Sequence, residues 1–233
     1  MLQAIGLTKK YGNFTALQDL HLHVQAGEIY CLLGANGAGK TTAIQLFLGF
    51  IAPSAGKVLV KEIDVTRQPI ESKQYLAYIP ENLTLYPHLT GVENLAYFAG
   101  LAKKKYTQPQ LKALLEEAGL QTDAHTKRVA HYSKGMRQKV GIALALAREA
   151  QALLLDEPTS GLDPQATHEF SNLLLRLQKK GVATLMATHD IFRAKQVATH
   201  IGIMKQGYLL KSFEAQHVDL PTLETLYLDT IQS

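Results

Sequence analysis

Short apolar runs predict β-strands in the first and last thirds of the chain. Residues 28–33 and 152–155 are almost continuously apolar, which is typical of strands buried on both faces of a parallel sheet. Residues 20–24 instead alternate apolar and histidine positions, as a strand with one face in water does. Further short strands are predicted at residues 56–60, 75–79 and 182–188.

The middle of the chain has the pattern of helices. Thr90 and Glu93 have the spacing of a capping box, in which each side chain binds the other residue's main-chain N–H, and predict a helix to about residue 102. Thr107 and Gln110 predict a second helix start, and Gly119 the end of that helix. Beyond residue 150, strands alternate with helices predicted at 164–180 and 191–198, which indicates a parallel sheet.

Composition adds few constraints. A chain of 233 residues with 46% hydrophobic and 19% charged content is ordinary for a globular protein. Its one cysteine, Cys31, excludes a disulfide framework and fits a reducing compartment. We expect neither a signal peptide nor a membrane span, and therefore a protein that is soluble on its own. The net charge of +4 permits an anionic partner or membrane surface without requiring one.

Residues 34–42 form a complete phosphate-binding loop, G-A-N-G-A-G-K-T-T, between a predicted strand and a predicted helix. Glycines let successive N–H groups turn toward a phosphate, Lys40 can reach its oxygens, and the Thr41 hydroxyl can bind Mg²⁺. The anion would lie at a helix N-terminus, which favours negative charge. The chain is therefore predicted to bind a nucleoside triphosphate through Gly34, Asn36, Gly37, Ala38, Gly39, Lys40, Thr41 and Thr42.

Two other strand ends carry candidate chemistry. Asp156 and Glu157 follow the apolar residues 152–155, and Pro158 prevents the strand from continuing. Ligands of open parallel sheets gather at this edge, where the first acid suits Mg²⁺ coordination and the second can polarise an attacking water. His189 follows the strand at 182–188 and is a candidate for contacting the γ-phosphate.

The phosphate loop, residues 132–138 (Y-S-K-G-M-R-Q), residues 156–163 (D-E-P-T-S-G-L-D) and His189 have the order and spacing of an ATP-binding cassette (ABC) ATPase. The chain resembles this family over essentially its whole length. The resemblance implies an α/β P-loop NTPase fold: a RecA-like core with a mostly parallel sheet, an N-terminal antiparallel β part and an inserted helical subdomain. It also implies a single nucleotide-binding domain over residues 1–233, with the helical subdomain at roughly 82–147.

The resemblance assigns roles to the candidate residues, with ATP and Mg²⁺ as cofactors. Glu157 corresponds to the catalytic base and His189 to the switch histidine. Thr41, Glu81 and Asp156 correspond to the magnesium ligands. Tyr11 stands where this family stacks an aromatic ring on adenine, a task that needs only a π-face; the alternative is a tyrosine of the core.

The family signature segment implies that two cassettes act together. Ser133 is a good N-cap for a helix predicted at 134–147, and a helix N-terminus suits a γ-phosphate. In the family, Ser133 and Gly135 contact the nucleotide of the other subunit, and Asp163 communicates across the interface. The expected partner is a second copy of the chain or a homologous cassette.

Three positions depart from the commonest family pattern. Lys134 replaces a glycine, Met136 replaces a glutamine, and Glu81 replaces the glutamine that senses Mg²⁺ and the membrane partner. These departures resemble a bacterial group of ATPases that drive exporters with six-helix permeases. Residues 80–91, with 132–138, are especially similar to ATPases of nitrous-oxide-reductase copper-maturation transporters.

The predicted function is therefore the ATP-hydrolysing subunit of a membrane transporter, acting in export. The resemblance implies a separate polytopic permease that selects the cargo, a location on the cytoplasmic face of the cell membrane, and no nucleic-acid partner. The alternative from another class is a soluble ABC ATPase acting on ribosomes or nucleic acid; a P-loop kinase fails to explain residues 133–138 and His189. The tail at 220–233 is predicted to pack on the cassette through Leu223, Leu226 and Tyr227.

Overall fold

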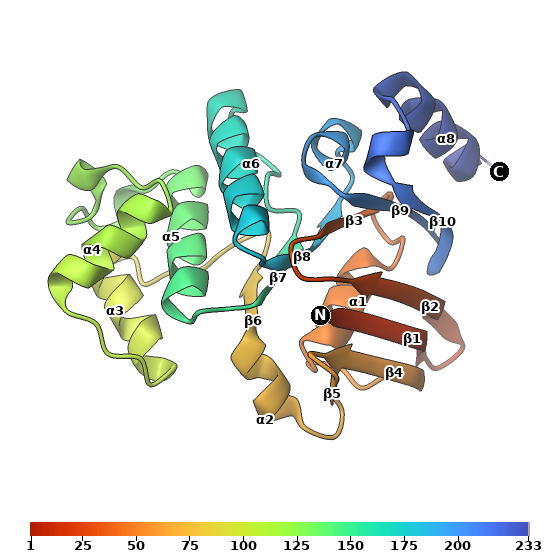
Figure 1. Ribbon diagram of the computed structural model, residues 1–233, viewed down its shortest axis with the longest axis horizontal. Coiled ribbons are helices and arrows are strands. Elements are labelled where there is room, and N and C mark those ends of the chain that lie inside the picture. The colour runs from red at the N-terminus through yellow and green to blue at the C-terminus, as the bar shows by residue number, and fades with distance from the viewer. Residues whose placement is uncertain (233) are drawn as a thin grey trace.

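Two β-sheets organise the chain in a computed structural model that describes residues 1–232 (Figure 1). An antiparallel sheet has the strand order β2-β1-β4-β5, and a six-stranded sheet has the order β10-β9-β3-β8-β7-β6. The strands of the first sheet are β1 (Leu2–Tyr11), β2 (Phe14–Val24), β4 (Ala55–Val60) and β5 (Ile63–Asp64). Those of the second are β3 (Ile29–Leu33), β6 (Leu76–Ile79), β7 (Ala152–Asp156), β8 (Ala183–Thr188), β9 (His200–Lys205) and β10 (Tyr208–Glu214).

The helices fall into distinct groups. Figure 1 shows α3, α4 and α5 together at one end of the molecule, while α8 and the chain's C-terminus lie at the other. No helix within the described residues is both long and apolar enough to cross a bilayer. The α-helices are α1 (Lys40–Phe47), α2 (Pro69–Ser72), α3 (Gly91–Leu101), α4 (Gln108–Glu117), α5 (Lys134–Ala147), α6 (Pro164–Lys179), α7 (Ile191–Val197) and α8 (Leu220–Gln232). Short 3₁₀ helices occupy Lys73–Tyr75, Thr122–Ala124, Val129–His131 and Ala215–His217.

Two apolar cores lie on opposite faces of the six-stranded sheet. Cys31 and Leu33 of β3 belong to the core shared with α3, α4, α5 and α6. Tyr30 and Leu32, the alternate positions, belong to the core shared with α1 and the antiparallel sheet. Because both faces of the strand are covered, its sequence is apolar without interruption. The division explains why residues 28–33 lack the alternation seen in β2.

Most elements that the sequence predicts are confirmed with boundaries shifted by one or two residues, but β2 begins at Phe14, well before the strand predicted at 20–24. The N–H of Thr90 donates to Glu93 Oε2 at 2.8 Å and Thr90 Oγ1 accepts from the Glu93 N–H at 3.2 Å, which completes the predicted capping box of α3. The N–H of Thr107 likewise donates to Gln110. In the predicted tail, Leu223 is fully buried, whereas Ser233 lies outside the described residues.

The parallel arrangement gathers the candidate residues at one edge of the sheet. β8 lies between β3 and β7, with Leu33 opposite Thr188 and Asp156 opposite Ala187. The phosphate loop, the acid pair and His189 therefore follow strand ends that are direct neighbours. β6 pairs with β7 on the far side, so Glu81 joins the same edge two residues after that strand. Four segments that are far apart in the sequence thus converge, as open parallel sheets allow.

Candidate nucleotide-binding and hydrolysis site

Close packing around the phosphate loop explains two of its glycines. Gly39 has a φ of 100°, and a side chain there would bring its Cβ within 2.7 Å of the Ala16 main-chain oxygen. At Gly34 a Cβ would approach the Met204 main-chain oxygen to 2.5 Å. The loop borders an open pocket of about 270 Å³. Its lining residues are Phe14, Ala16, Asn36, Gly37, Ala38, Gly39, Lys40, Thr41, Thr42, Glu81, Asp156 and Glu157.

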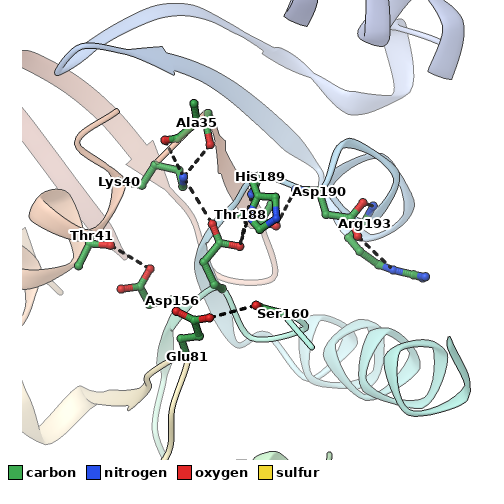
Figure 2. A network of polar contacts seen from close by, with 12 residues as sticks. Ala35, Lys40, Thr41, Glu81, Asp156, Ser160, Thr188, His189, Asp190 and Arg193 are labelled. Atoms are coloured by element: carbon green, nitrogen blue, oxygen red, sulfur yellow. Dashed lines mark hydrogen bonds and ion pairs between the residues drawn. The ribbon is translucent and has the colours of Figure 1, made fainter. Parts of the chain in front are cut away.

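Lys40, the first residue of α1, directs its ammonium group back along the loop. Its Nζ donates to the main-chain oxygens of Gly34 at 2.6 Å and Ala35 at 3.1 Å, and lies 3.4 Å from Glu157 Oε1 (Figure 2). The residue is only 5% exposed, so these partners replace much of the water that a free ammonium would bind. The positive charge is thereby held inside the pocket, where phosphate oxygens would compete for it.

Asp156 and Thr41 place two oxygen ligands together. The Thr41 hydroxyl donates to Asp156 Oδ1 at 3.2 Å. Burial raises the pKa of the Asp156 carboxyl, and the negative charges of Glu157 and Glu81 raise it further, against opposing effects of Thr41 and Lys40. Carboxylate and hydroxyl oxygens suit Mg²⁺, and a cation would relieve the repulsion at this carboxylate.

The protein does not supply a complete metal cage here. Within the described residues, no three histidine, cysteine, aspartate or glutamate side chains are grouped so as to hold a metal ion. Mg²⁺ bound at Thr41 and Asp156 would therefore complete its shell with phosphate oxygens and water, the arrangement usual for magnesium at nucleotide sites. The donor set fits a magnesium–nucleotide complex better than a permanently resident ion.

Glu157 lies between Lys40 and His189. Its Oε2 is 2.9 Å from His189 Nδ1, and it also receives the His189 main-chain N–H at 3.4 Å. The side chain is 13% exposed, and Oε1 is buried without a hydrogen-bond partner among the described residues. Its backbone has a φ of 45°, a strained value for a non-glycine residue, and functional sites commonly carry such strain. A carboxylate that faces Lys40 on one oxygen and His189 on the other can accept a proton from water once phosphate oxygens compete for the Lys40 ammonium.

The two aromatic residues at the β1–β2 turn differ in position. Tyr11, predicted to stack on adenine, is 48% exposed and packs under the Lys9 ammonium, but it does not line the pocket. Phe14, its pairing partner across the turn, is 65% exposed and does line the pocket. Sequence reasoning did not identify Phe14. The available signal was a second aromatic residue immediately after the Gly12–Asn13 turn.

Ser133, Gly135 and Asp163 line a different pocket. Ser133 caps α5, accepting from the Met136 N–H at 3.2 Å, and Asp163 caps α6, accepting from the Ala166 N–H at 2.8 Å. Both caps and Gly135 border a cavity that shares no lining residue with the phosphate-loop pocket. The structure therefore separates these three residues from the other predicted site residues.

The fold and the phosphate-loop pocket define a P-loop nucleoside triphosphatase. The sequence matches the ABC transporter family over residues 17–160. It is 35% identical over 222 residues to the bacitracin transport ATP-binding protein BcrA of Bacillus licheniformis, covering 94% of this chain and 71% of that protein. It is also 37% identical over 206 residues to the Fe(3+) ions import ATP-binding protein FbpC of Brucella melitensis, covering 86% of this chain and 57% of that protein.

Among solved structures, the ATP-binding subunit of an ABC transporter superposes with a TM-score of 0.84 at 29% identity, covering 98% of this chain and 99% of that one. The chain belongs to the ABC transporter family as an ATP-binding subunit and is an ATPase. The predicted fold class is confirmed, including the antiparallel N-terminal sheet and the mostly parallel second sheet.

Proposed function

We propose that this chain hydrolyses ATP within a head-to-tail pair of cassettes and thereby drives a separate membrane permease. The observation that carries the proposal is the separation of two half-sites: the phosphate-loop pocket contains the hydrolytic residues, whereas Ser133 and Gly135 line another pocket. A second chain, turned end for end, would present its Ser133 to the first chain's nucleotide. Each ATP would then be bound by both chains.

Lys40 and the N–H groups of the loop bind the phosphates in this proposal. Glu157 accepts a proton from the water that attacks the γ-phosphorus. Its Oε1 makes no hydrogen bond within the described residues and faces Lys40 Nζ, for which the phosphate oxygens would compete, so Oε1 is the oxygen proposed to take the proton. His189 Nδ1 orients the Glu157 carboxylate. The other ring nitrogen of His189, Nε2, then remains available to contact the phosphate or the attacking water. The task of the protein is positioning and electrostatic stabilisation, as phosphoryl transfer requires.

Mg²⁺ accompanies the nucleotide. Thr41 and Asp156 would hold it, with Glu81 at the edge of the same pocket accepting from its water. When bound, the ion would neutralise phosphate charge and stabilise the charge that develops on the leaving group. It would also offset the repulsion among the three carboxylates at this edge.

The second cassette contributes an anion-binding helix end. Ser133 stands at the N-terminus of α5, where free N–H groups and the helix dipole attract a γ-phosphate. Asp163 lines the same pocket, and its proposed role is to communicate across the interface with the site that binds the partner's nucleotide. The partner is a second copy or a homologous cassette.

The proposed transport direction is export, with the chain bound to the cytoplasmic face of the membrane. Glu81, Lys134 and Met136 support this direction because they resemble an exporter group that includes the copper-maturation ATPases. BcrA is named for bacitracin transport, whereas FbpC is named for import, so similarity of the cassette alone does not choose the direction. The cargo is selected by the permease.

Glu157→Gln tests the hydrolytic and dimeric parts of the proposal. The variant keeps the shape of the side chain but removes the base, so we expect hydrolysis to fall on the order of 10²–10⁴-fold while ATP still binds. Size-exclusion chromatography with ATP and Mg²⁺ should show a dimer that ADP does not produce. Hydrolysis near the wild-type rate would refute the base assignment, and a variant that stays monomeric with bound ATP would refute the composite site.

Purification of the tagged chain from its native cells in mild detergent tests the membrane partnership. A polytopic membrane protein in stoichiometric amount is the expected companion, and transport assays on the reconstituted complex in vesicles would give the direction. Ribosomal proteins or DNA without a membrane subunit would instead support the soluble alternative. The ATP chemistry would stand in either case.

A further inference from the structure

Glu81 is held by two elements that are distant in the sequence. The Ser160 hydroxyl donates to Glu81 Oε1 at 3.0 Å (Figure 2). Behind the same residue, Gln138 Nε2 of α5 approaches the main-chain oxygens of Pro80 at 3.4 Å and Glu81 at 3.5 Å. These last two hydrogen bonds are long and reach the backbone alone, so among the described residues the contact from Ser160 is the hydrogen bond that restrains the Glu81 carboxylate.

Ser160 belongs to the turn that begins at the proposed base. Its N–H donates to the Glu157 main-chain oxygen at 3.1 Å, which fixes the serine one turn beyond Glu157. The turn includes two residues in the left-handed region, Glu157 and Gly161, and it leads directly into Asp163 at the cap of α6. The Ser160 hydroxyl thus connects the loop after β6 with the segment that carries both Glu157 and Asp163.

The charges in the pocket explain why the Glu81 side chain needs this hydrogen bond to stay in place. Glu81, Asp156 and Glu157 all line the pocket, and Lys40 is the one cationic side chain among its described lining residues. Glu81 is close enough for its charge to disfavour the ionised form of Asp156. Like charges at this spacing repel, and a free glutamate side chain would lower the repulsion by rotating toward solvent. A hydroxyl donor on one carboxylate oxygen opposes that rotation.

We propose that Ser160 is a positioning residue that holds the Glu81 carboxylate at the nucleotide pocket. The inference rests on the proposed function, because the purpose of the restraint is to keep a third carboxylate in place for magnesium-bound nucleotide. Ser160 itself contacts neither nucleotide nor metal in this account; it acts through Glu81. Without its hydroxyl, the magnesium-dependent part of nucleotide binding weakens, whereas contacts made by the loop and Lys40 remain.

Ser160→Ala tests the inference by equilibrium binding of a fluorescent mant-labelled non-hydrolysable ATP analogue, with Mg²⁺ and with EDTA. We expect the Kd with Mg²⁺ to rise roughly threefold to tenfold, the net effect of losing an ordinary intramolecular hydrogen bond, because the loss acts on the nucleotide indirectly through Glu81. The Kd in EDTA should stay unchanged, and Ser160→Thr, which keeps a hydroxyl, should restore wild-type binding. An unchanged Kd with Mg²⁺, or an equal loss in EDTA, would overturn the inference.

Glu81→Ala removes the same hydrogen bond from the other side. If Ser160 acts through Glu81, adding Ser160→Ala to Glu81→Ala changes nothing further; an undiminished effect in that background would contradict the proposal. The matched control is Thr159→Val, because the Thr159 hydroxyl forms no hydrogen bond within the described residues. Wild-type chain that binds nucleotide without any preference for Mg²⁺ would instead refute the proposed magnesium site, and this inference with it.

Discussion

At the scale of single residues, Asp156 lowers the stability of the folded chain while it supplies a ligand for the proposed magnesium ion. Its carboxylate is buried beside two other carboxylates, so its pKa in the folded chain is higher than in the unfolded chain. Between the two pKa values the native state binds more protons than the unfolded state. Stability therefore falls as the pH rises through this window, and at neutral pH the ionised group costs free energy.

Asp156→Asn should consequently stabilise the chain that carries no nucleotide. The neutral amide can still accept from Thr41, so we expect a gain of about 1 kcal/mol, or roughly 2–4 °C in Tm at neutral pH. Thermal melts of both proteins from neutral to acidic pH check the sign: the difference should shrink as Asp156 becomes protonated. Magnesium-dependent hydrolysis should be lost in the same variant. A lower Tm than wild type at neutral pH would contradict the electrostatic account.

The turn between β1 and β2 offers a comparison of two aromatic residues. Phe14 lines the nucleotide pocket, whereas Tyr11 lies beside it under Lys9. We expect Phe14→Ala to weaken ATP binding about tenfold, the loss of one stacked ring, and Phe14→Tyr to retain it. Titration with ATP and with inorganic triphosphate, which has no base to stack, separates this contact from the phosphate contacts. If Tyr11→Ala weakens ATP binding and Phe14→Ala does not, adenine stacks on Tyr11, as the family resemblance implies, and not on the residue that lines the pocket.

At the scale of elements, α5 combines a structural cap with a proposed ligand contact in one residue. Ser133 accepts from the Met136 N–H, and its removal leaves a helix-end donor without a side-chain partner. The same hydroxyl is proposed to meet the nucleotide of the other chain. A single substitution therefore changes stability and assembly together.

Two substitutions at Ser133 separate these roles. Ser133→Ala should cost about 1 kcal/mol of stability, whereas Ser133→Gly should cost only a few tenths, because glycine tolerates the cap conformation. Both should lose the ATP-dependent dimer when combined with Glu157→Gln. Urea unfolding and size-exclusion chromatography measure the two properties. A Ser133→Gly chain that still dimerises with ATP would show that the hydroxyl is not required across the interface.

At the scale of the whole molecule, the proposed pair of chains makes a prediction that no single chain can satisfy. Lys40→Ala damages the phosphate-loop half of a site and Ser133→Ala the other half, so each homodimer has two damaged sites. In a mixed dimer one site carries both defects and the other carries neither. Equal mixing should restore roughly a quarter of wild-type ATPase activity if the dimer is two-fold symmetric and its sites are independent.

The measurement is the ATPase rate across mixing ratios, with each variant alone as the reference. Recovery should peak at the equal mixture. Lys40→Ala mixed with Lys40→Met is the matched control, because every mixed dimer then has two damaged loops and should recover nothing. If the mixture of Lys40→Ala and Ser133→Ala chains stays inactive, both halves of each site belong to the same chain.

The local elements were largely predictable because their causes are local. The box formed by Thr90 and Glu93 and the N-cap at Ser133 depend on residues three apart, and both are present. The strands β1, β9 and β10 were not predicted individually from the sequence. Several side chains of the edge strand β10 are exposed, so it lacks the continuous apolar run of the buried strands. The helical subdomain boundaries and the roles of individual site residues remain predictions.

The sequence by itself determined the chemistry that the chain can perform. The phosphate loop and the acid pair at Asp156 and Glu157 are contiguous motifs, and short-range geometry makes them recognisable without a fold. Only the tertiary structure decided which of them meet. The strand order places β8 between β3 and β7, so Glu157 lies within contact of both Lys40 and His189. The turn after Glu157 places the Ser160 hydroxyl within hydrogen-bond distance of Glu81. Contacts across so many residues depend on sheet pairing and packing, which no local pattern encodes.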